Sequence, residues 1–366
     1  MKITIERKSF VEALAIGSQM SSKAKGLSIL ENCKLKVNGE YAIISSYDGE
    51  VAITKRVGIV SSEGDFTYCI EPKALLAILR SIKDDNVVLA FDDCICEIIH
   101  TRGKQSMPYE HADDYPTPVL DAENNCFSID SSVMFEWFSE ARNFVGVNTL
   151  YPALMGVYVY CGNNECGVAA TNTEILYHNN KPIDYDGEEF GASLSIKAIS
   201  ALLPMLNATY NVSIMIGSRN ISFKTEDSML VATKPEQPYP NFRRIIPKNQ
   251  PIQVSVNKDD LLGSIKRSML MANEATGLLK MSISENSMCI TSENPMYSKK
   301  AKEECSCNCV GGDIELGLKG NYAISMLNSI ESEELVFTLE TPQRPIIWCD
   351  MLNNQKILLQ MPCQTV

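Results

Sequence analysis

The sequence predicts an α+β protein that consists of three similar domains. Two observations support this: 366 residues exceed what one simple hydrophobic core accommodates, and one order of strands and helices occurs three times. Each copy has a strand, a helix, several strands, a second helix and closing strands. We therefore expect domains at residues 1–121, 126–245 and 246–366, each with two helices packed on antiparallel sheets.

The first copy shows these signals most clearly. KITI alternates as a strand does, and residues 7–20 carry apolar side chains at helical spacing. CKLKV, YAIISS and VAITKRV then read as strands separated by Asn-Gly and Asp-Gly turn signals. FTYCI leads to Pro72, which suits the first turn of the helix KALLAILRSIK, and VVLAF and CEIIH close the copy.

The second and third copies follow the same order. FSID precedes the helical SSVMFEWFSEARNFV, and ASLSI precedes KAISALL, where Pro204 is expected to shorten or kink the helix. IQVSV precedes KDDLLGSIKRSMLMA, and IELGL precedes KGNYAISMLNSI.

Equivalent positions recur at a nearly constant spacing in the three copies. Ile5, Ile129 and Val256 each precede a first helix at spacings of 124 and 127 residues. Two further sets of positions recur at nearly the same spacing. Each second helix begins at a lysine: Lys73, Lys197 and Lys319. The strand after each second helix contains a valine: Val88, Val212 and Val336. The period is far longer than a solenoid unit, so each copy is expected to be a domain.

Composition describes a cytoplasmic globular protein. No apolar run reaches the length of a membrane span, and the charged, alternating N-terminus does not resemble a signal peptide. Thirteen cysteines without a secretion signal indicate mostly free thiols in a reducing compartment.

The net charge of −12 is unevenly distributed. The predicted helices and the loop after the first one carry +8, and the rest of the chain carries −20. If the helices share a face, that face suits sequence-independent contact with a phosphate backbone. The alternative is that Lys and Arg are enriched there as good helix formers.

The segment PYPNFRRIIP at 238–247, here called the crossover, separates the second copy from the third. Its three prolines disfavour helix and central strand, so it should run extended over the surface, anchored by Ile245 and Ile246.

The whole chain resembles the bacterial DNA polymerase III beta subunit, the sliding clamp family. The resemblance rests on MKITIERKSFVEAL, LSILEN, the triple repeat, ATNTEIL at 170–176, the crossover and the terminal MPC at 361–363. It implies a DNA clamp fold in which two subunits join head to tail into a closed ring around double-stranded DNA. It also implies a processivity factor in DNA replication, without catalysis or cofactor, whose partners are the polymerase III catalytic subunit and the clamp loader.

The resemblance also implies sites. The partner-peptide cleft would comprise Leu154, Thr171, Leu176, Pro240, Arg244, Ile245, Leu359, Met361 and Pro362. The DNA-facing candidates are Lys23, Lys25, Lys73, Arg80, Lys197, Lys266, Arg267 and Lys319. The subunit contact would include Ile78, Leu270 and Met271. For each single residue, a solvated surface side chain or ordinary core packing is the alternative.

The cleft departs from the family pattern at several positions. Where the family commonly shows T-D-G-H-R-L, this chain has Thr171 to Leu176 as TNTEIL, which replaces a His-Arg pair by Glu-Ile. Tyr151 replaces a usual Arg, and the tail ends in Cys363-Gln364-Thr-Val. We expect the pocket to persist with an altered peptide preference.

Other chemistry is weakly indicated. Cys305, Cys307 and Cys309 could suggest a metal or thiol site, but their spacing is not that of structural zinc, and free thiols on an edge strand are the preferred interpretation. No phosphate-binding loop, nucleophile elbow or H-E-x-x-H motif occurs. A rival hypothesis is an interaction hub that keeps the clamp fold but no longer encircles DNA.

Overall fold

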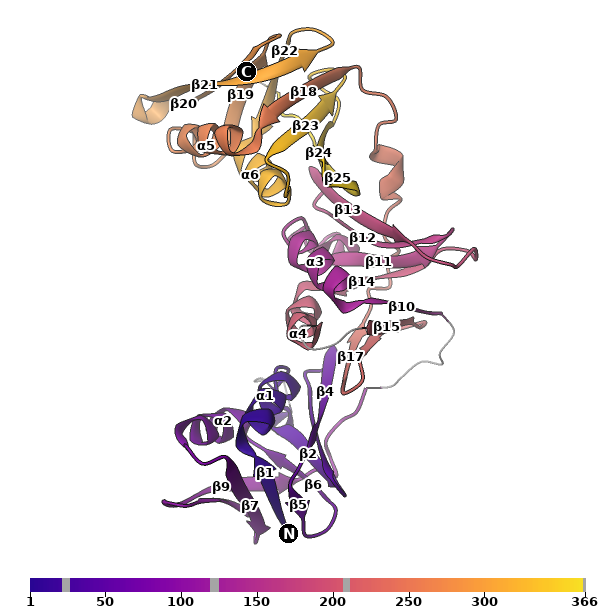
Figure 1. Cartoon of the computed structure of the whole chain (residues 1–366), viewed down its shortest axis with the longest axis vertical. Coiled ribbons are helices and arrows are strands. Elements are labelled where there is room, and N and C mark those ends of the chain that lie inside the picture. The colour runs from indigo at the N-terminus through magenta and orange to yellow at the C-terminus, as the bar shows by residue number, and fades with distance from the viewer. Residues whose placement is uncertain (22–26, 119–124, 207–210, 365–366) are drawn as a thin grey trace. The chain divides into compact units, whose positions relative to one another are not determined.

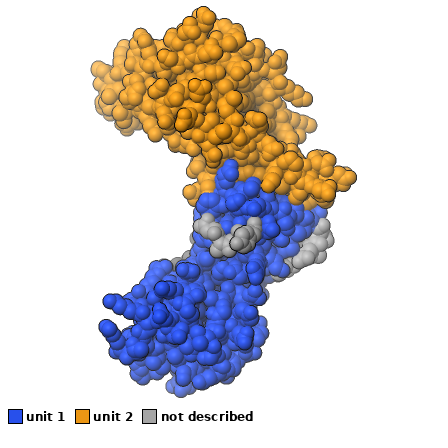
Figure 2. All heavy atoms as spheres, viewed as in Figure 1, with its two compact units in different colours: residues 1–136, 194–236 blue, residues 137–193, 237–366 orange. Residues whose placement is uncertain are grey.

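The computed structural model describes residues 1–21, 27–118, 125–206 and 211–364. Two compact units divide the chain, residues 1–136 with 194–236 and residues 137–193 with 237–366 (Figure 2). Six α-helices lie in the described residues (Figure 1): α1 (Arg7–Gly17), α2 (Pro72–Ser81), α3 (Ser131–Ala141), α4 (Ile196–Leu206), α5 (Lys258–Met269) and α6 (Gly320–Asn328). They confirm the expectation of two helices per repeat.

The first unit contains one 13-stranded antiparallel sheet. Its order is β10-β15-β16-β17-β4-β3-β2-β6-β9-β8-β7-β1-β5. The strands are β1 (Lys2–Glu6), β2 (Cys33–Asn38), β3 (Tyr41–Tyr47), β4 (Val51–Gly58), β5 (Ser61–Ser62), β6 (Phe66–Ile70), β7 (Asn86–Asp92), β8 (Ile95–His100), β9 (Gly103–His111), β10 (Cys126–Asp130), β15 (Asn211–Ile216), β16 (Asn220–Lys224) and β17 (Ser228–Thr233).

The second unit is built on a 12-stranded antiparallel sheet. Its order is β14-β11-β12-β13-β25-β24-β23-β18-β21-β20-β19-β22. The strands are β11 (Gly156–Gly162), β12 (Glu165–Thr171), β13 (Ile175–Pro182), β14 (Phe190–Ser195), β18 (Ile252–Asn257), β19 (Leu278–Ile283), β20 (Ser287–Asn294), β21 (Lys299–Val310), β22 (Ile314–Lys319), β23 (Glu334–Leu339), β24 (Ile346–Asp350) and β25 (Asn353–Gln360).

Strand pairing repeats with the sequence. The first strand of each copy pairs antiparallel with the strand after the second helix, so that Ile5 faces Val87, Ile129 faces Val212 and Val256 faces Leu335. The same two strands therefore pair in each copy, although the middle copy is shifted by one residue relative to the other two. The internal repeat found in the sequence is therefore a structural repeat.

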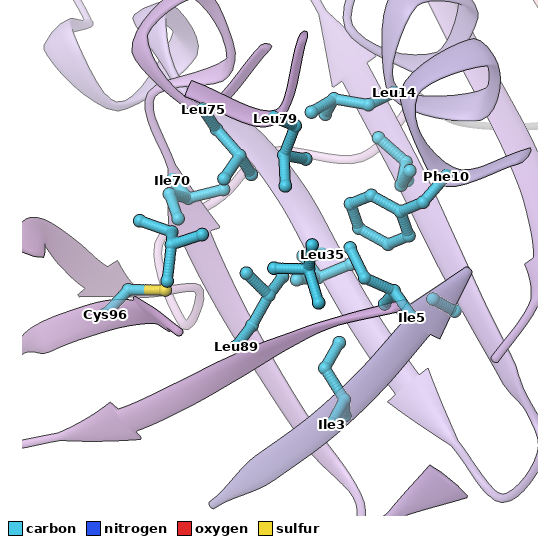
Figure 3. Close-up of a cluster of buried hydrophobic side chains, with 14 of the residues drawn as sticks. Ile3, Ile5, Phe10, Leu14, Leu35, Ile70, Leu75, Leu79, Leu89 and Cys96 are labelled. Atoms are coloured by element: carbon cyan, nitrogen blue, oxygen red, sulfur yellow. The ribbon is translucent and has the colours of Figure 1, made fainter. Parts of the chain in front are cut away.

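The first repeat shows how the helices are held on the strands (Figure 3). Phe10 and Leu14 of α1 and Leu75 and Leu79 of α2 are at most 1% exposed and point toward apolar side chains of the sheet, among them Leu35. Burying each such side chain stabilises the fold by about 1.5–3 kcal/mol. At the start of α1, the Glu6 carboxylate accepts hydrogen bonds from the backbone N–H groups of Lys8 and Ser9.

Two expectations need correction. Helix α4 runs through Pro204 to Leu206, and its 11 residues equal the length of α1 and α3. Pro204 lies in the last turn, where its missing N–H removes a single terminal hydrogen bond, so the helix is not shortened.

The cysteine strand is also not at an edge. The first part of β21 pairs with β20, where Cys305 faces Met288, and the last part pairs with β18, where Cys309 faces Val254. This 12-residue strand is long enough to have a partner on each side at different ends.

Candidate functional site

Contrary to the expectation from its prolines, the crossover does not run extended throughout: it forms a short 3-10 helix, η3 (Phe242–Ile245), and its buried anchor is Phe242 rather than Ile245. Phe242 is 4% exposed and lies in a cluster with Leu176 of β13 and Leu359 of β25, against which Met361 also packs. The structure thus brings together three of the predicted cleft residues from segments far apart in sequence. Ile245 is 46% exposed, so its side chain is available to a partner.

The turn from Thr171 to Leu176 keeps a defined geometry despite its unusual sequence. Asn172 Oδ1 accepts hydrogen bonds from the N–H groups of Glu174 and Ile175, both at 3.0 Å, and Thr171 Oγ1 donates to the Ile175 carbonyl. Thr173 adopts a φ of +82°. An Asn side chain that closes a turn onto its own backbone explains why the turn persists here.

Glu174 ties this turn to the C-terminal tail. Its carbonyl accepts a hydrogen bond from the Met361 N–H at 2.8 Å, and its carboxylate pairs with Lys319 Nζ, with 2.7 Å to Oε1. The Cys363 N–H donates to the Gly317 carbonyl at 2.8 Å. The acidic residue that replaces the expected basic pair is therefore neutralised by a neighbouring lysine.

The two arginines of the crossover have different surroundings. Arg243 Nη2 lies 2.7 Å from Glu165 Oε1, Arg243 Nη1 lies 2.8 Å from Glu189 Oε2, and the guanidinium stacks 4.6 Å from the Tyr160 ring centroid. Arg244 is exposed and lines a cavity of about 520 Å³. The same cavity is lined by Tyr158, Glu189, Tyr239, Pro240, Asn241, Phe242, Arg243 and Lys248.

A buried polar network lies behind Arg243. His178 Nε2 lies 2.8 Å from the Tyr160 hydroxyl, and His178 is only 5% exposed. Burial, together with the Arg243 charge, lowers the pKa of His178 to about 4. Sequence reasoning missed Arg243 and His178. The paired arginines were visible as a signal, but which of them faces inward depends on the turn.

The remaining predicted cleft residues lie in the same unit. Leu154 is 8% exposed on the 3-10 helix η2 (Pro152–Met155), Thr171 is buried, and Pro362 is half-buried. Tyr151, just before η2, is 53% exposed.

The DNA-facing candidates fall into two groups. Lys73, Arg80 and Lys266 are exposed on helices. Lys197, Arg267 and Lys319 are engaged in ion pairs, with Asp48, Glu303 and Glu174 respectively. Lys23 and Lys25 lie outside the described residues.

The dimer-contact candidates also differ from one another. Leu270 and Met271, which follow α5, are 70% and 36% exposed. Ile78 is half-buried and packs against the core of the first repeat. Exposed apolar side chains are those that a subunit contact would bury.

The metal or thiol site considered at Cys305, Cys307 and Cys309 has little support in the part of the chain that the structure describes. No group of three or more His, Cys, Asp or Glu side chains there could hold a metal ion. All thirteen cysteines are free, and burial raises the pKa of Cys305 to about 11, which disfavours the reactive thiolate. No described helix is long and apolar enough to cross a membrane.

Comparisons with known proteins agree with this fold. The family model of the DNA polymerase III beta subunit N-terminal domain matches residues 1–121, and that of its C-terminal domain matches residues 243–364. The beta sliding clamp of Haemophilus influenzae is 20% identical over 337 residues, covering 92% of each chain.

Solved structures resemble the whole chain. The crystal structure of the DNA polymerase III subunit beta from Pseudomonas aeruginosa has a TM-score of 0.95 at 19% identity, with 100% of both chains covered. A sliding clamp from the same organism bound to griselimycin gives the same values.

The repeated α+β architecture, together with the two matching family models, identifies a DNA sliding clamp, a processivity factor of replication. The chain belongs to the DNA polymerase III beta subunit family.

Proposed function

We propose that two copies of this chain close head to tail into a ring that encircles double-stranded DNA in the cytoplasm. In this proposal residues 1–121, 126–245 and 246–366 are three clamp domains, and the contacts of Leu270, Met271 and Ile78 help to close the ring. Exposed cations such as Lys73, Arg80 and Lys266 then hold the phosphate backbone without sequence preference. Retention comes from ring closure, so weak salt-sensitive contacts permit sliding.

We further propose that the polymerase III catalytic subunit and the clamp loader bind the cleft at the crossover. The observation that carries this proposal is the packing of Leu176, Leu359 and Met361 with Phe242 of η3, the short helix whose last residue, Ile245, is exposed. A concave apolar surface with a cation at its rim, here Arg244, suits a short extended peptide.

Encirclement is tested by loading the protein onto circular and linearised DNA. A dimeric native mass and retention on circular DNA, lost when the circle is cut, are expected. Combined Lys73→Glu, Arg80→Glu and Lys266→Glu should weaken binding to linear DNA at least tenfold at low salt, whereas a loaded ring should stay on circular DNA because its retention comes from closure. The control is Lys224→Glu, an exposed strand residue. A monomer, or a dimer that binds the polymerase but is never retained on circles, would overturn encirclement and indicate an interaction hub.

Partner binding is tested by pull-down of the polymerase III catalytic subunit. Ile245→Ala should reduce capture at least tenfold, whereas Val310→Ala, which alters a 63% exposed side chain elsewhere, should not. Equal capture by both variants would refute the cleft assignment.

A further inference from the structure

A second groove lies in the first unit, where β4 pairs with β17. It has a volume of about 220 Å³. Its apolar and aromatic lining includes Tyr47, Ile53, Tyr115, Met229 and Val231. The Tyr115 hydroxyl is held by the Tyr47 N–H and the Asn32 carbonyl, which orients its ring at the wall of the groove.

This groove is the internal-repeat equivalent of the cleft at the crossover. Tyr115-Pro116 and Tyr239-Pro240 are 124 residues apart, and each pair lines a cavity. The strand pairing is also equivalent, because Ala52 faces Val231 as Leu176 faces Leu359.

The turns beside the two grooves repeat as well. Asp48 Oδ1 accepts hydrogen bonds from the N–H groups of Glu50 and Val51 at 3.0 and 2.8 Å, as Asn172 Oδ1 does in its own turn. Lys197, at the start of α4, pairs with Asp48, and its repeat equivalent Lys319 pairs with Glu174. The same lysine position thus ties down the turn beside each groove.

The charge of the groove indicates what it would bind. Lys34 is the one charged side chain among the described residues that line it. Its Nζ lies 5.2 Å from the centroid of the Tyr115 ring. A partly desolvated ammonium over an aromatic wall attracts a carboxylate more strongly than a fully solvated lysine does.

We propose that this groove binds a short extended peptide of a partner protein, with an apolar side chain against Tyr47 and Met229 and an acidic side chain at Lys34. The proposal rests on the proposed peptide binding at the crossover cleft, because it extends that role to the equivalent junction. The protein would then offer two kinds of peptide site per chain. A partner with two motifs could use both at once, which raises its effective concentration.

The experiment selects peptides from a phage-displayed library of random 12-residue sequences on the full-length protein. Enriched peptides are sorted by their affinity for single variants. We expect one class that contains an acidic residue and binds at least tenfold more weakly to Lys34→Gln and to Met229→Lys. In that class, replacing the acidic residue by its amide should cause a similar loss.

Two controls separate this groove from the crossover cleft. Lys36→Gln alters the exposed lysine two positions along β2 and should leave the affinity of this class unchanged. Ile245→Ala should also leave it unchanged. Selection of no peptide sensitive to Lys34 and Met229, or only of peptides lost with Ile245→Ala, would overturn the second site. Failure of the proposed function appears separately, in the polymerase pull-down with Ile245→Ala.

Discussion

Lys319 Nζ lies 2.7 Å from Glu174 Oε1, which joins the residue before α6 to the turn between β12 and β13. The sequence presents the two residues as independent features, Lys319 as a DNA-facing candidate and Glu174 as part of the replacement for a His-Arg pair. Because they neutralise each other, neither has its full charge available to a partner. The net charge at this edge of the cleft therefore depends on Lys319 and Glu174 together.

Glu174→Gln should change ligand preference more than stability. The pair is partly exposed, at 35% for Lys319 and 42% for Glu174, so its loss should cost only about 0.5 kcal/mol. Lys319 would then present a free charge, and acidic peptides should bind several-fold more tightly at low salt, with the gain disappearing at high salt. Fluorescence anisotropy at two salt concentrations measures this. Glu315→Gln, which breaks the exposed pair with Lys280, should leave the affinity unchanged.

Arg243→Ala should reduce stability, whereas Arg244→Ala should reduce peptide binding. Arg243 bridges Glu165 and Glu189, so its removal should lower the free energy of unfolding by about 2 kcal/mol. Arg244 is exposed, and its removal should weaken partner-peptide binding while leaving the melting temperature nearly unchanged. Thermal melts combined with peptide titration distinguish the two. Equal melting temperatures for the two variants would contradict this difference.

Stability should fall in mild acid because of His178. Its pKa is lowered from 6.5 to about 4 in the folded chain, so the folded state disfavours the protonated imidazole. Above pH 6.5 the histidine is neutral in both the folded and the unfolded chain, so it does not oppose folding. As the pH falls from 6.5 toward 4, the unfolded chain binds the proton first, and the free energy of unfolding decreases. The free energy of unfolding should decrease by up to about 1.4 kcal/mol for each pH unit in this range.

His178→Gln should flatten this part of the stability profile, measured by urea unfolding at several pH values. His100→Gln, which changes a histidine in the first repeat, should leave the slope as in the unmodified protein. A profile for His178→Gln that is as steep as that of the unmodified protein would contradict the assignment.

Lys356→Ala should be among the most destabilising single changes. Lys356 is 4% exposed, and its Nζ contacts Glu140 Oε1 at 3.1 Å, Asp350 Oδ2 at 3.7 Å and the Ser329 carbonyl at 3.0 Å. Removing the cation leaves the buried Asp350 carboxylate without the Lys356 charge, which should lower the free energy of unfolding by about 3 kcal/mol. Thermal and chemical unfolding measure this.

The exposed Lys302 gives the matched control for that change. It pairs with Glu304, and both side chains are 66% exposed. Lys302→Ala should leave the melting temperature almost unchanged. Similar losses in the two variants would show that burial of Lys356 is not the cause.

Local patterns were a good guide to the elements and their repetition. Pro72 lies in the first turn of α2, as expected, because its fixed φ and missing N–H suit that position. At Pro204 the helix is not shortened, which the sequence could not show, since a helix that ends at an interior proline and one that contains proline in its last turn look alike in sequence. The expectation failed for the cysteine strand, because the number of neighbours of a strand depends on the sheet order.

The sequence by itself determined the α+β class, the threefold repeat and the position of the crossover, since periodicity, turn residues and repeat spacing are local properties of the chain. Only the tertiary structure decided which side chains meet. It placed Arg243 inward beside two glutamates and left Arg244 exposed, and it paired Lys319 with Glu174 across 145 residues. Such contacts depend on which strands become neighbours, and strand pairing between distant segments leaves no periodic trace in the sequence.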